Sequence, residues 1–216
     1  MAAGLFYVYT DPGSVDEAEF HDWYDHEHGP ARLTVPGFRG ACRYQALDGE
    51  KPSWLALYDL DGPEVIDSPG YKALGARASD RDKAVAAGLA TLDRRVYEQV
   101  SQDGTRPDGD PAPVILAVAM SVPASAEEDL AAWYAEEHIP MLLQVPGCRR
   151  IRTFRLRQSL DGPGPDFLSL HELAGPEVLD EPGYRAAVST PWRDQVVASV
   201  LRWERRVFGF RNAIGS

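Results

Sequence analysis

The sequence predicts an α+β fold in which one βαββαβ unit occurs twice along the chain. The segment WYDHEHGPARLTVPGFR from Trp23 recurs as WYAEEHIPMLLQVPGCR from Trp133, an offset of 110 residues. Two later segments match in the same order: LDGPEVIDSPGYKAL from Leu60 with LAGPEVLDEPGYRAA from Leu173, and RRVYEQV from Arg94 with RRVFGF from Arg205. Three ordered matches over nearly the whole chain indicate an internal duplication.

The first copy begins with an apolar and aromatic run, LFYVYT at residues 5–10, which is typical of a β-strand. Residues 14–17 predict a capping box, in which the Ser14 hydroxyl accepts hydrogen bonds from the first turn of a helix. Phe20, Trp23 and Tyr24 follow at helical spacing, and the Pro-Gly at residues 36–37 ends the helical region.

The rest of each copy follows the same order. In the first copy we expect strands at residues 38–47 and 53–60, a helical region at 63–91 interrupted near residue 69, and a closing strand that carries RRV. The second copy predicts a cap at residues 125–128, strands at 149–158 and 166–173, and a helical region at 176–202. It carries three more residues between the first and second matches, because the offset rises from 110 to 113 there. The segments SLDGPGPD and LDGEKPS lie in this stretch, which places a hairpin tip there.

The expected domains are residues 1–100 and 114–216, joined by a polar, Pro- and Gly-rich linker at residues 101–113. Within each domain, four antiparallel strands with both helices on one face form the ferredoxin-like arrangement. The other face of such a sheet would be bare, and apolar sheet surface has to be covered. We therefore expect the two sheets to pack against each other as a pseudo-twofold barrel with the helices outside.

Composition narrows the classes of partner. Apolar residues make up 44% and charged residues 25% of the chain, and the formal net charge is −11, which argues against nucleic acid or an anionic membrane as a partner. Cys42 and Cys148 are not at equivalent positions, so a disulfide framework is not expected. With no signal peptide and no apolar run near 18 residues, we expect a cytoplasmic protein.

The repeated pattern W-Y-x-x-E-H-x-P, followed by Pro-Gly and an aromatic strand, resembles the dimeric α/β-barrel superfamily and particularly its EthD-like branch. In that branch a His-x-Pro motif ends the first helix, and here the motif stands as His28-Gly29-Pro30 and His138-Ile139-Pro140. The resemblance implies the fold and the class of site. Similar members include cofactor-free monooxygenases, polyketide cyclases, dehydratases, lactone isomerases and haem-binding proteins, so it does not imply one reaction.

The leading catalytic candidates are His28 and His138, because a histidine beside a glutamate near a helix end can act as an acid or a base at neutral pH. The structural alternative is that each histidine ties its helix end to a neighbouring strand. The aromatic residues one turn earlier are candidates for reaching the same cavity, or for core packing. They are the catalytic candidates Tyr24 and Tyr134 and the substrate-binding candidates Trp23 and Trp133.

Glu27 and Glu137 lie on the same helical stripe, where a carboxylate has to be paired. We expect ion pairs with Arg39 and Arg149 or with the arginines of the RRV segments. The functional alternative is that each glutamate orients the neighbouring histidine, or borders the substrate.

The third strands differ between the copies. Tyr58 corresponds to His171 and Trp54 to Phe167, and all four residues lie on one face of their strands. If that face looks at the helices, Tyr58 and His171 approach the motif histidines as catalytic candidates and Phe167 borders substrate. If it looks at the other sheet, they are interior packing.

The first strands differ as well, because Tyr7 and Tyr9 correspond to Ala117 and Ala119. Two tyrosines fill space that two alanines leave open, so the second copy is expected to hold the larger cavity and the working site. The alternatives are that the tyrosines supply phenols to a site in the first copy, or that they only compensate core volume.

No metal or organic cofactor is expected. His21, His26 and His28 match no zinc-binding spacing, and the chain contains no dinucleotide, P-loop or nucleophile-elbow motif. The preferred interpretation is a cofactor-independent cyclase, dehydratase, isomerase or lyase that moves a proton on a small apolar aromatic or polyketide-like substrate. A cofactor-independent monooxygenase and a non-catalytic small-molecule-binding protein are the alternatives, and further association into a homodimer is left open.

Overall fold

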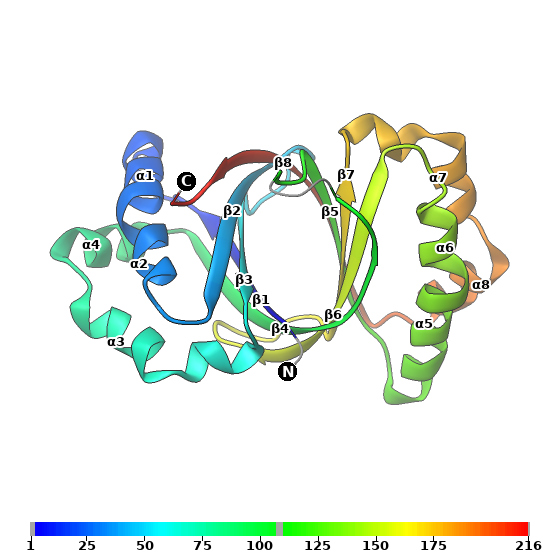
Figure 1. Ribbon diagram of the computed structural model, residues 1–216, viewed down its shortest axis with the longest axis horizontal. Coiled ribbons are helices and arrows are strands. Elements are labelled where there is room, and N and C mark those ends of the chain that lie inside the picture. Colours follow the sequence, from blue (N-terminus) through cyan, green and yellow to red (C-terminus); the bar gives the residue numbers. More distant parts are fainter. Residues whose placement is uncertain (1–2, 107–109, 216) are drawn as a thin grey trace. The chain divides into compact units, whose positions relative to one another are not determined.

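The computed structural model describes residues 3–106 and 110–215, and its strands and helices follow twice in the βαββαβ order that the repeat predicts. The strands are β1 (Gly4–Asp11), β2 (Phe38–Ala46), β3 (Trp54–Leu60), β4 (Thr91–Gly104), β5 (Val114–Ser121), β6 (Cys148–Ser159), β7 (Phe167–Leu173) and β8 (Arg202–Ala213). They are hydrogen-bonded in the order β1-β3-β2-β8-β5-β7-β6-β4 of a closed antiparallel barrel, which confirms the predicted α+β fold class (Figure 1).

Strand register repeats between the copies. Phe6 in β1 lies opposite Tyr58 of β3 and Val96 of β4. The equivalent residue of β5, Leu116, lies opposite His171 of β7 and Val207 of β8. The strands of the two copies therefore pair in the same register. Tyr58 and His171 occupy equivalent positions in the structure, as the sequence alignment of the copies predicts.

The described residues form two compact units that do not follow the repeat boundary everywhere. The first unit holds residues 3–99, 156–164 and 210–215, and the second holds the remaining described residues. Residues 101–104, expected in the linker, continue β4 instead, because Ser101 and Thr105 bond to Thr153 and Arg149 beside them. Residues 107–109 of the expected linker lie outside the described residues.

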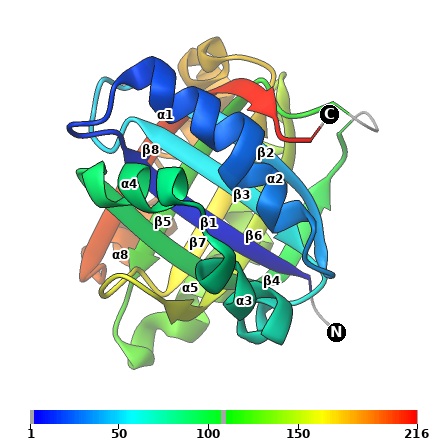
Figure 2. The same ribbon diagram turned by 90° about the vertical axis from the view of Figure 1, so that its left-hand side faces the viewer.

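In the first unit, four helices cover one face of β1–β4 (Figure 2). They are α1 (Glu17–Trp23), α2 (Gly29–Leu33), α3 (Pro69–Arg77) and α4 (Asp80–Gly88), with a π-helical turn at Tyr24–His28 and a 3₁₀ turn at Pro63–Asp67. After α2, Gly37 takes a φ of 100°, a conformation suited to glycine, and so ends the helical region as predicted.

The second unit repeats this arrangement. Its helices are α5 (Glu127–Trp133), α6 (Ile139–Leu142), α7 (Pro182–Ala187) and α8 (Pro191–Ala198), with a π-helical turn at Tyr134–His138 and 3₁₀ turns at Ala124–Ala126 and Pro176–Asp180. The unit has its own apolar core, which includes Leu116, Trp133 and Ile151.

The predicted capping boxes are wrong in both copies. Asp16, not Ser14, caps α1 by accepting from the backbone N–H groups of Ala18 and Glu19. The Ser14 hydroxyl donates to the carbonyl of Gly88 instead, which ties the loop to the end of α4. In the second copy, a 3₁₀ turn precedes α5 and no side chain caps that helix.

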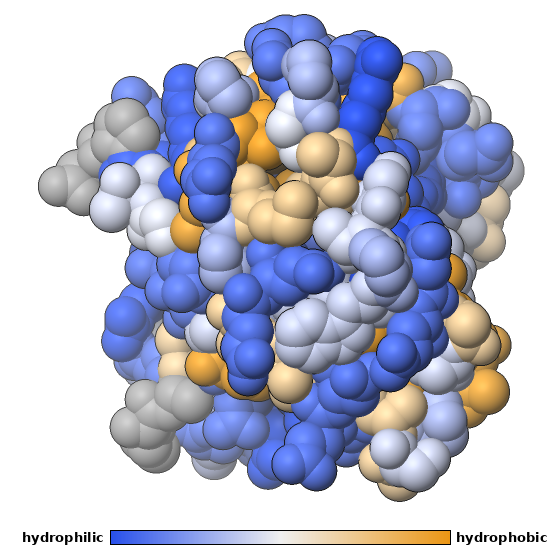
Figure 3. All heavy atoms as spheres, turned by 90° about the vertical axis from the view of Figure 1, so that its right-hand side faces the viewer, coloured by the Kyte–Doolittle hydropathy of each residue, from blue (hydrophilic) through white to orange (hydrophobic). Residues whose placement is uncertain are grey.

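No helix in the described part of the chain combines the length and the apolar character needed to cross a membrane. On the face drawn in Figure 3, which lies on the side of α5–α8, hydrophilic residues cover most of the surface and hydrophobic ones lie between them in small groups. This surface fits a chain in which 25% of the residues are charged, an ordinary fraction for a globular protein.

Candidate functional site

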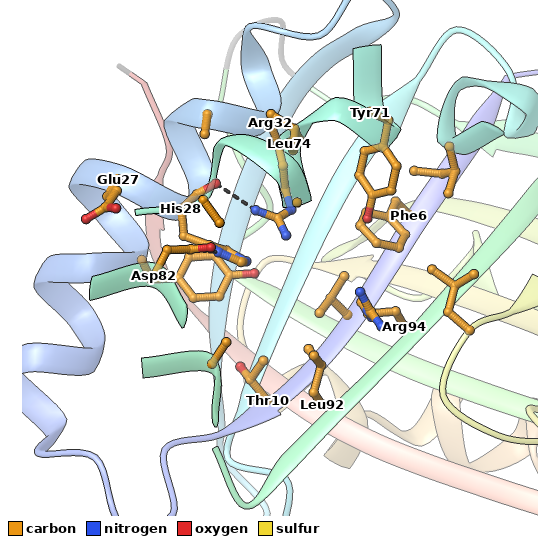
Figure 4. Close-up of a pocket in the computed structure, with 18 of the residues that line it drawn as sticks. Phe6, Thr10, Glu27, His28, Arg32, Tyr71, Leu74, Asp82, Leu92 and Arg94 are labelled. Carbon is orange, nitrogen blue, oxygen red and sulfur yellow. Dashed lines mark hydrogen bonds and ion pairs between the residues drawn. The ribbon is translucent and has the colours of Figure 1, made fainter. Parts of the chain in front are cut away.

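A cavity of about 550 Å³ lies in the first unit, between its sheet and its helices. Phe6 and Val8 of β1 and Leu92 of β4 supply apolar surface from the sheet, and α3 contributes Tyr71 and Leu74. The charged and polar lining includes Glu27, His28, Arg32, Asp82 and Arg94, most of which Figure 4 shows gathered at one end of the cavity. Cavities of this size and mixed lining are typical of small-molecule sites.

His28 reaches the cavity from the π-helical turn. The N–H of Gly29 donates to the carbonyl of Tyr24, five residues earlier, and Pro30 has no N–H with which to continue the α-helical pattern. The same bond joins Ile139 to Tyr134 in the second copy. The His-x-Pro motif is therefore the signature of a local widening of the helix, and such turns are frequent at functional sites.

The ring of His28 is held by Asp82 of α4. Asp82 Oδ1 lies 2.8 Å from Nδ1 of His28 and accepts a 2.9 Å hydrogen bond from Nε1 of Trp23. Because a carboxylate can only accept, Nδ1 carries the proton and Nε2 is left with its lone pair. Nε2 has no hydrogen-bond partner among the described residues, so it is the nitrogen available to a ligand in the cavity.

Electrostatics keep His28 neutral. Burial, aided by the nearby Arg32, lowers the pKa of His28 to about 3, although Asp82 acts in the opposite direction. The folded protein therefore holds His28 in its proton-accepting form at neutral pH. The pKa of Asp82 is lowered, chiefly by the hydrogen bond from His28, so this carboxylate is ionised.

Tyr24 and Tyr58 form a second polar pair beside His28. The Tyr58 hydroxyl donates to that of Tyr24 over 3.1 Å, and Tyr24 lines the cavity with its ring 5.2 Å from that of His28. Burial raises the pKa of both phenols, so both remain protonated. The face of β3 that carries Tyr58 and Trp54 thus looks at the helices, the first of the two alternatives left open by the sequence.

The second copy builds a different arrangement from the equivalent histidine. His138 Nδ1 bonds to the carbonyl of Ala187 at 3.2 Å, and its ring stacks on Trp133. The ring of His171 lies 6.1 Å away, and its Nε2 meets the Ser169 hydroxyl at 2.9 Å. Burial lowers the pKa of His138 to about 4 and that of His171 to about 3. These two histidines approach each other, but no carboxylate orients either of them.

The expectation of a larger cavity in the second copy is not met by the cavity described above, which lies in the first unit. Along β1, Phe6 and Val8 face the helices, so Tyr7 and Tyr9 point to the opposite face of the sheet. There the Tyr7 hydroxyl donates to that of Tyr9. The exchange of two tyrosines for two alanines therefore changes side-chain volume on the face of the sheet opposite the helices, not on the face that borders this cavity.

The two glutamates are paired, but not with the expected arginines. Glu27 accepts a hydrogen bond from the Ser79 hydroxyl and lies 3.6 Å from Arg81. Glu137 accepts from Trp133 Nε1 at 3.1 Å and from the Thr190 hydroxyl at 2.5 Å. The prediction was wrong because Arg39 pairs with Asp61 after β3. Ser79 and Arg81 at the beginning of α4 hold Glu27, and Thr190 before α8 together with Trp133 of α5 holds Glu137.

The remaining sequence candidates lie outside the cavity. Tyr134 packs beside the core of the second unit, and Phe167 lies beneath the guanidinium of Arg155, 4.8 Å from its ring centre. His21 contacts Arg43, and His26 contacts Asp22, so neither converges with His28. Within the described residues no cluster of three or more His, Cys, Asp or Glu side chains could hold a metal ion.

Asp82, Arg32, Arg94 and Tyr71 were not among the sequence candidates. The differences in sequence between the two copies could have identified two of these residues. Arg32 aligns with Leu142, and Asp82 aligns with Arg193, since both follow a capping hydroxyl by three residues in α4 and α8. Positions where duplicated copies diverge from polar to apolar, or in charge, point to a function kept in one copy.

The longer hairpin of the second copy forms part of the cavity wall in the first unit. Gln158 and Leu160 line the cavity, and the Leu160 N–H donates to the carbonyl of Arg94 at 2.9 Å. Asp161 accepts from Arg94 three times, from its backbone N–H (2.9 Å), Nε (2.8 Å) and Nη2 (2.7 Å). The three extra residues thus help to close this site.

Replacing Asp161 with alanine should loosen that wall. We expect the Leu160 amide to exchange with solvent deuterium at least about 10-fold faster, and the free energy of unfolding to fall by about 1–2 kcal/mol, because a bidentate, partly buried ion pair is lost. Asp61→Ala, which removes a highly exposed pair with Arg39, is the control and should cost less than about 0.5 kcal/mol. Unchanged exchange at Leu160 would show that the pair does not hold the hairpin.

Comparison with protein-family models and with characterised proteins gives no match. Solved structures do match over nearly the whole chain. An anthrone oxidase-like protein has a TM-score of 0.69 at 13% identity, covering 98% of this chain and 92% of its own. A ferredoxin-fold protein from Listeria monocytogenes, related to antibiotic biosynthesis monooxygenases, scores 0.55 at 9% identity, covering 98% and 96%. The fold is that of the dimeric α+β barrels.

A heme-degrading enzyme from Listeria monocytogenes also matches, with a TM-score of 0.51 at 9% identity over 96% of this chain and 99% of that chain. The similarity of this enzyme and of the two proteins above to the chain lies in backbone geometry rather than in shared side chains. At such low identities the dimeric α+β barrel is established as the fold, and the chemistry has to be argued from the residues of the site.

Proposed function

We propose that the chain is an enzyme that transfers a proton on a small, apolar, aromatic or polyketide-like molecule, with His28 as the base. The observation that carries this proposal is the hydrogen bond between Asp82 and Nδ1 of a neutral His28, whose Nε2 is left without a protein partner in a cavity. The His-x-Pro motif supports membership of the EthD-like branch within the same proposal.

In this mechanism Nε2 removes a proton from a carbon beside a carbonyl group, or from a phenol. Asp82 stabilises the imidazolium that forms, because it accepts from Nδ1–H and carries a negative charge. The Tyr24 hydroxyl, which accepts from Tyr58, keeps its own proton to donate to the substrate oxygen that gains charge. Return of the proton from His28 to another atom completes an isomerisation, dehydration, cyclisation or C–C cleavage.

Cofactor-independent oxygenation is the second candidate, and the anthrone oxidase-like neighbour favours it. The first step would be the same, since a phenolate or a stabilised carbanion is the species that can react with O₂ as the oxidant. Oxygenation and proton transfer therefore differ only in whether O₂ is consumed after His28 has acted.

Haem is the competing occupant, because one neighbour is named a heme-degrading enzyme. If haem were bound in this cavity, Nε2 of His28 is the nitrogen that would hold its iron, and the haem would supply redox chemistry. No organic cofactor enters the proposed reaction. A Soret absorption band in the purified protein would identify haem and would assign His28 to iron rather than to proton transfer.

Exchange of carbon-bound hydrogen provides the test. We expect the protein in D₂O to accelerate deuterium incorporation into at least one member of a panel of anthrones, naphthols and 1,3-diketones, followed by NMR. Asp82→Asn should slow this exchange by about 10²- to 10⁴-fold, because the amide no longer selects the Nδ1–H tautomer or balances the imidazolium.

Measuring oxygen consumption with an electrode on the same panel distinguishes oxygenation from simple proton transfer. Consumption of O₂ in step with substrate turnover would indicate oxygenation. A panel member that binds tightly but exchanges no faster than in buffer, in wild type and in Asp82→Asn alike, would contradict the enzyme proposal. That outcome would select a non-catalytic binding protein.

A further inference from the structure

Arg32 places a positive charge inside the cavity. It lies on α2, one turn after His28, and its Nη1 donates to the carbonyl of His28 at 2.8 Å. Figure 4 shows its guanidinium extending into the space between the His28–Asp82 pair and Tyr71. Among residues 3–106 and 110–215, no carboxylate lies within ion-pair distance of this half-buried group.

The other cations that line the cavity are paired or exposed to solvent. Arg94 is paired with Asp161, and Lys72 lies 3.8 Å from Asp67. Of the other two acids that line it, Glu27 lies 3.6 Å from Arg81. Asp82 has the uncharged partners His28 and Trp23, and Arg32 acts on it from beyond ion-pair distance. Arg77 also borders the cavity, but its side chain is exposed to solvent. Arg32 is thus a half-buried cation of the cavity lining whose donors can still form an ion pair with a ligand.

Burying a guanidinium group without an ion-pair partner costs free energy. A half-buried arginine of this kind is therefore expected where an anion binds to it. Its planar set of donors matches a carboxylate in a two-bond arrangement, and its bond to the His28 carbonyl orients it. The fold does not require an arginine here, because the second copy has Leu142 at the equivalent position. The chain's net charge of −11 also shows that this cation is not part of a generally basic surface.

We infer that Arg32 binds a carboxylate of the ligand, so that the substrate class is aromatic or polyketide-like carboxylic acids rather than neutral molecules. The inference rests on the proposed function only for the role of His28, since binding at Arg32 needs no turnover. The carboxylate anchors the ligand one helical turn from His28, while Phe6, Leu74 and Leu92 contact its apolar body.

The test compares 2-naphthoate with the neutral 2-naphthamide by calorimetric titration. Wild type should bind the naphthoate more tightly. Arg32→Leu should weaken naphthoate binding by about 10- to 100-fold and naphthamide binding by less than about threefold, the range expected for a charge-assisted pair. Lys83→Leu, which removes a surface cation outside the cavity, is the control and should leave both affinities unchanged.

Equal affinity of wild type for the two probes, no binding of naphthoate, or an Arg32→Leu protein that keeps the preference would each overturn the inference. Arg32→Gln gives the same comparison if the leucine variant folds poorly. His28→Gln should keep the naphthoate preference. Loss of turnover with that preference intact therefore separates the carboxylate site from the catalytic proposal, and either can fail alone.

Discussion

Replacing His28 with glutamine lowers the turnover number by about 10²- to 10⁴-fold, whereas replacing His138 with glutamine leaves it within about threefold. The two histidines occupy the same place in the repeat, so general damage to the fold should be alike. They differ in their partners, since Asp82 orients His28 and a backbone carbonyl holds His138. The comparison therefore isolates the chemistry from the architecture.

A double variant and the pH–rate profile test the same assignment of His28. The double variant His28→Gln/Asp82→Asn should be no slower than His28→Gln alone, because residues that act as one unit do not lose activity additively. The acid limb of the pH–rate profile should lie well below pH 6.5, since protonation of His28 stops it from accepting a proton and its pKa is lowered to about 3. An equal loss in His138→Gln would place the working site in the second copy and contradict the assignment.

Replacing Asp25 with alanine should lower the free energy of unfolding by about 3–5 kcal/mol, the usual result of removing one partner of a buried ion pair. Arg43 is 1% exposed, and its Nη1 donates to Asp25 Oδ1 at 2.6 Å. The other carboxylate oxygen accepts from Arg211 at 2.6 Å, which ties the π-helical turn to the end of β8 within the first unit. Without Asp25, two guanidinium groups lose their common counter-ion.

His21 does not replace that counter-ion. It contacts Arg43 at 3.1 Å, but burial and then Arg43 lower its pKa to about 4, so it stays neutral and supplies no negative charge. Burial acts to raise the pKa of Asp25, but the hydrogen bonds from Arg211 and Arg43 outweigh it and the net shift is downward. The pair therefore stabilises the fold above the ordinary pKa of an aspartate, and this contribution is lost as the pH falls through the lowered value.

Urea unfolding at neutral pH measures this effect. Asp25→Ala should also lose its disadvantage relative to wild type as the solution is made acidic. The double variant Asp25→Leu/Arg43→Met is the decisive companion, because it removes the buried charge together with its partner and should be more stable than Asp25→Ala. A double variant as unstable as the single one would mean that lost packing, not the uncompensated charge, sets the cost.

The architecture could be predicted from the sequence because it is encoded locally and twice. The apolar runs at residues 5–10 and 114–119, the repeated WYxxEHxP segment and the Pro-Gly after it specify strand, helix and turn through nearest neighbours in the chain. Duplication then supplied the second sheet that one ferredoxin-like sheet requires. The position of His28 follows from the same local periodicities, whereas the face of the sheet that carries Tyr58 was left open by them and was decided by the tertiary structure.

Only the tertiary structure decided which of the two motif histidines is oriented by a carboxylate. Asp82 lies 54 residues after His28, on α4. The packing of α4 on the sheet sets which side of this helix faces His28, and no local sequence pattern predicts that contact. Likewise, only the tertiary structure places Arg32 in the cavity with no ion-pair partner within 4 Å among the described residues. Local propensity determines elements, whereas burial and long-range pairing determine charge states, and the chemistry of this site depends on the latter.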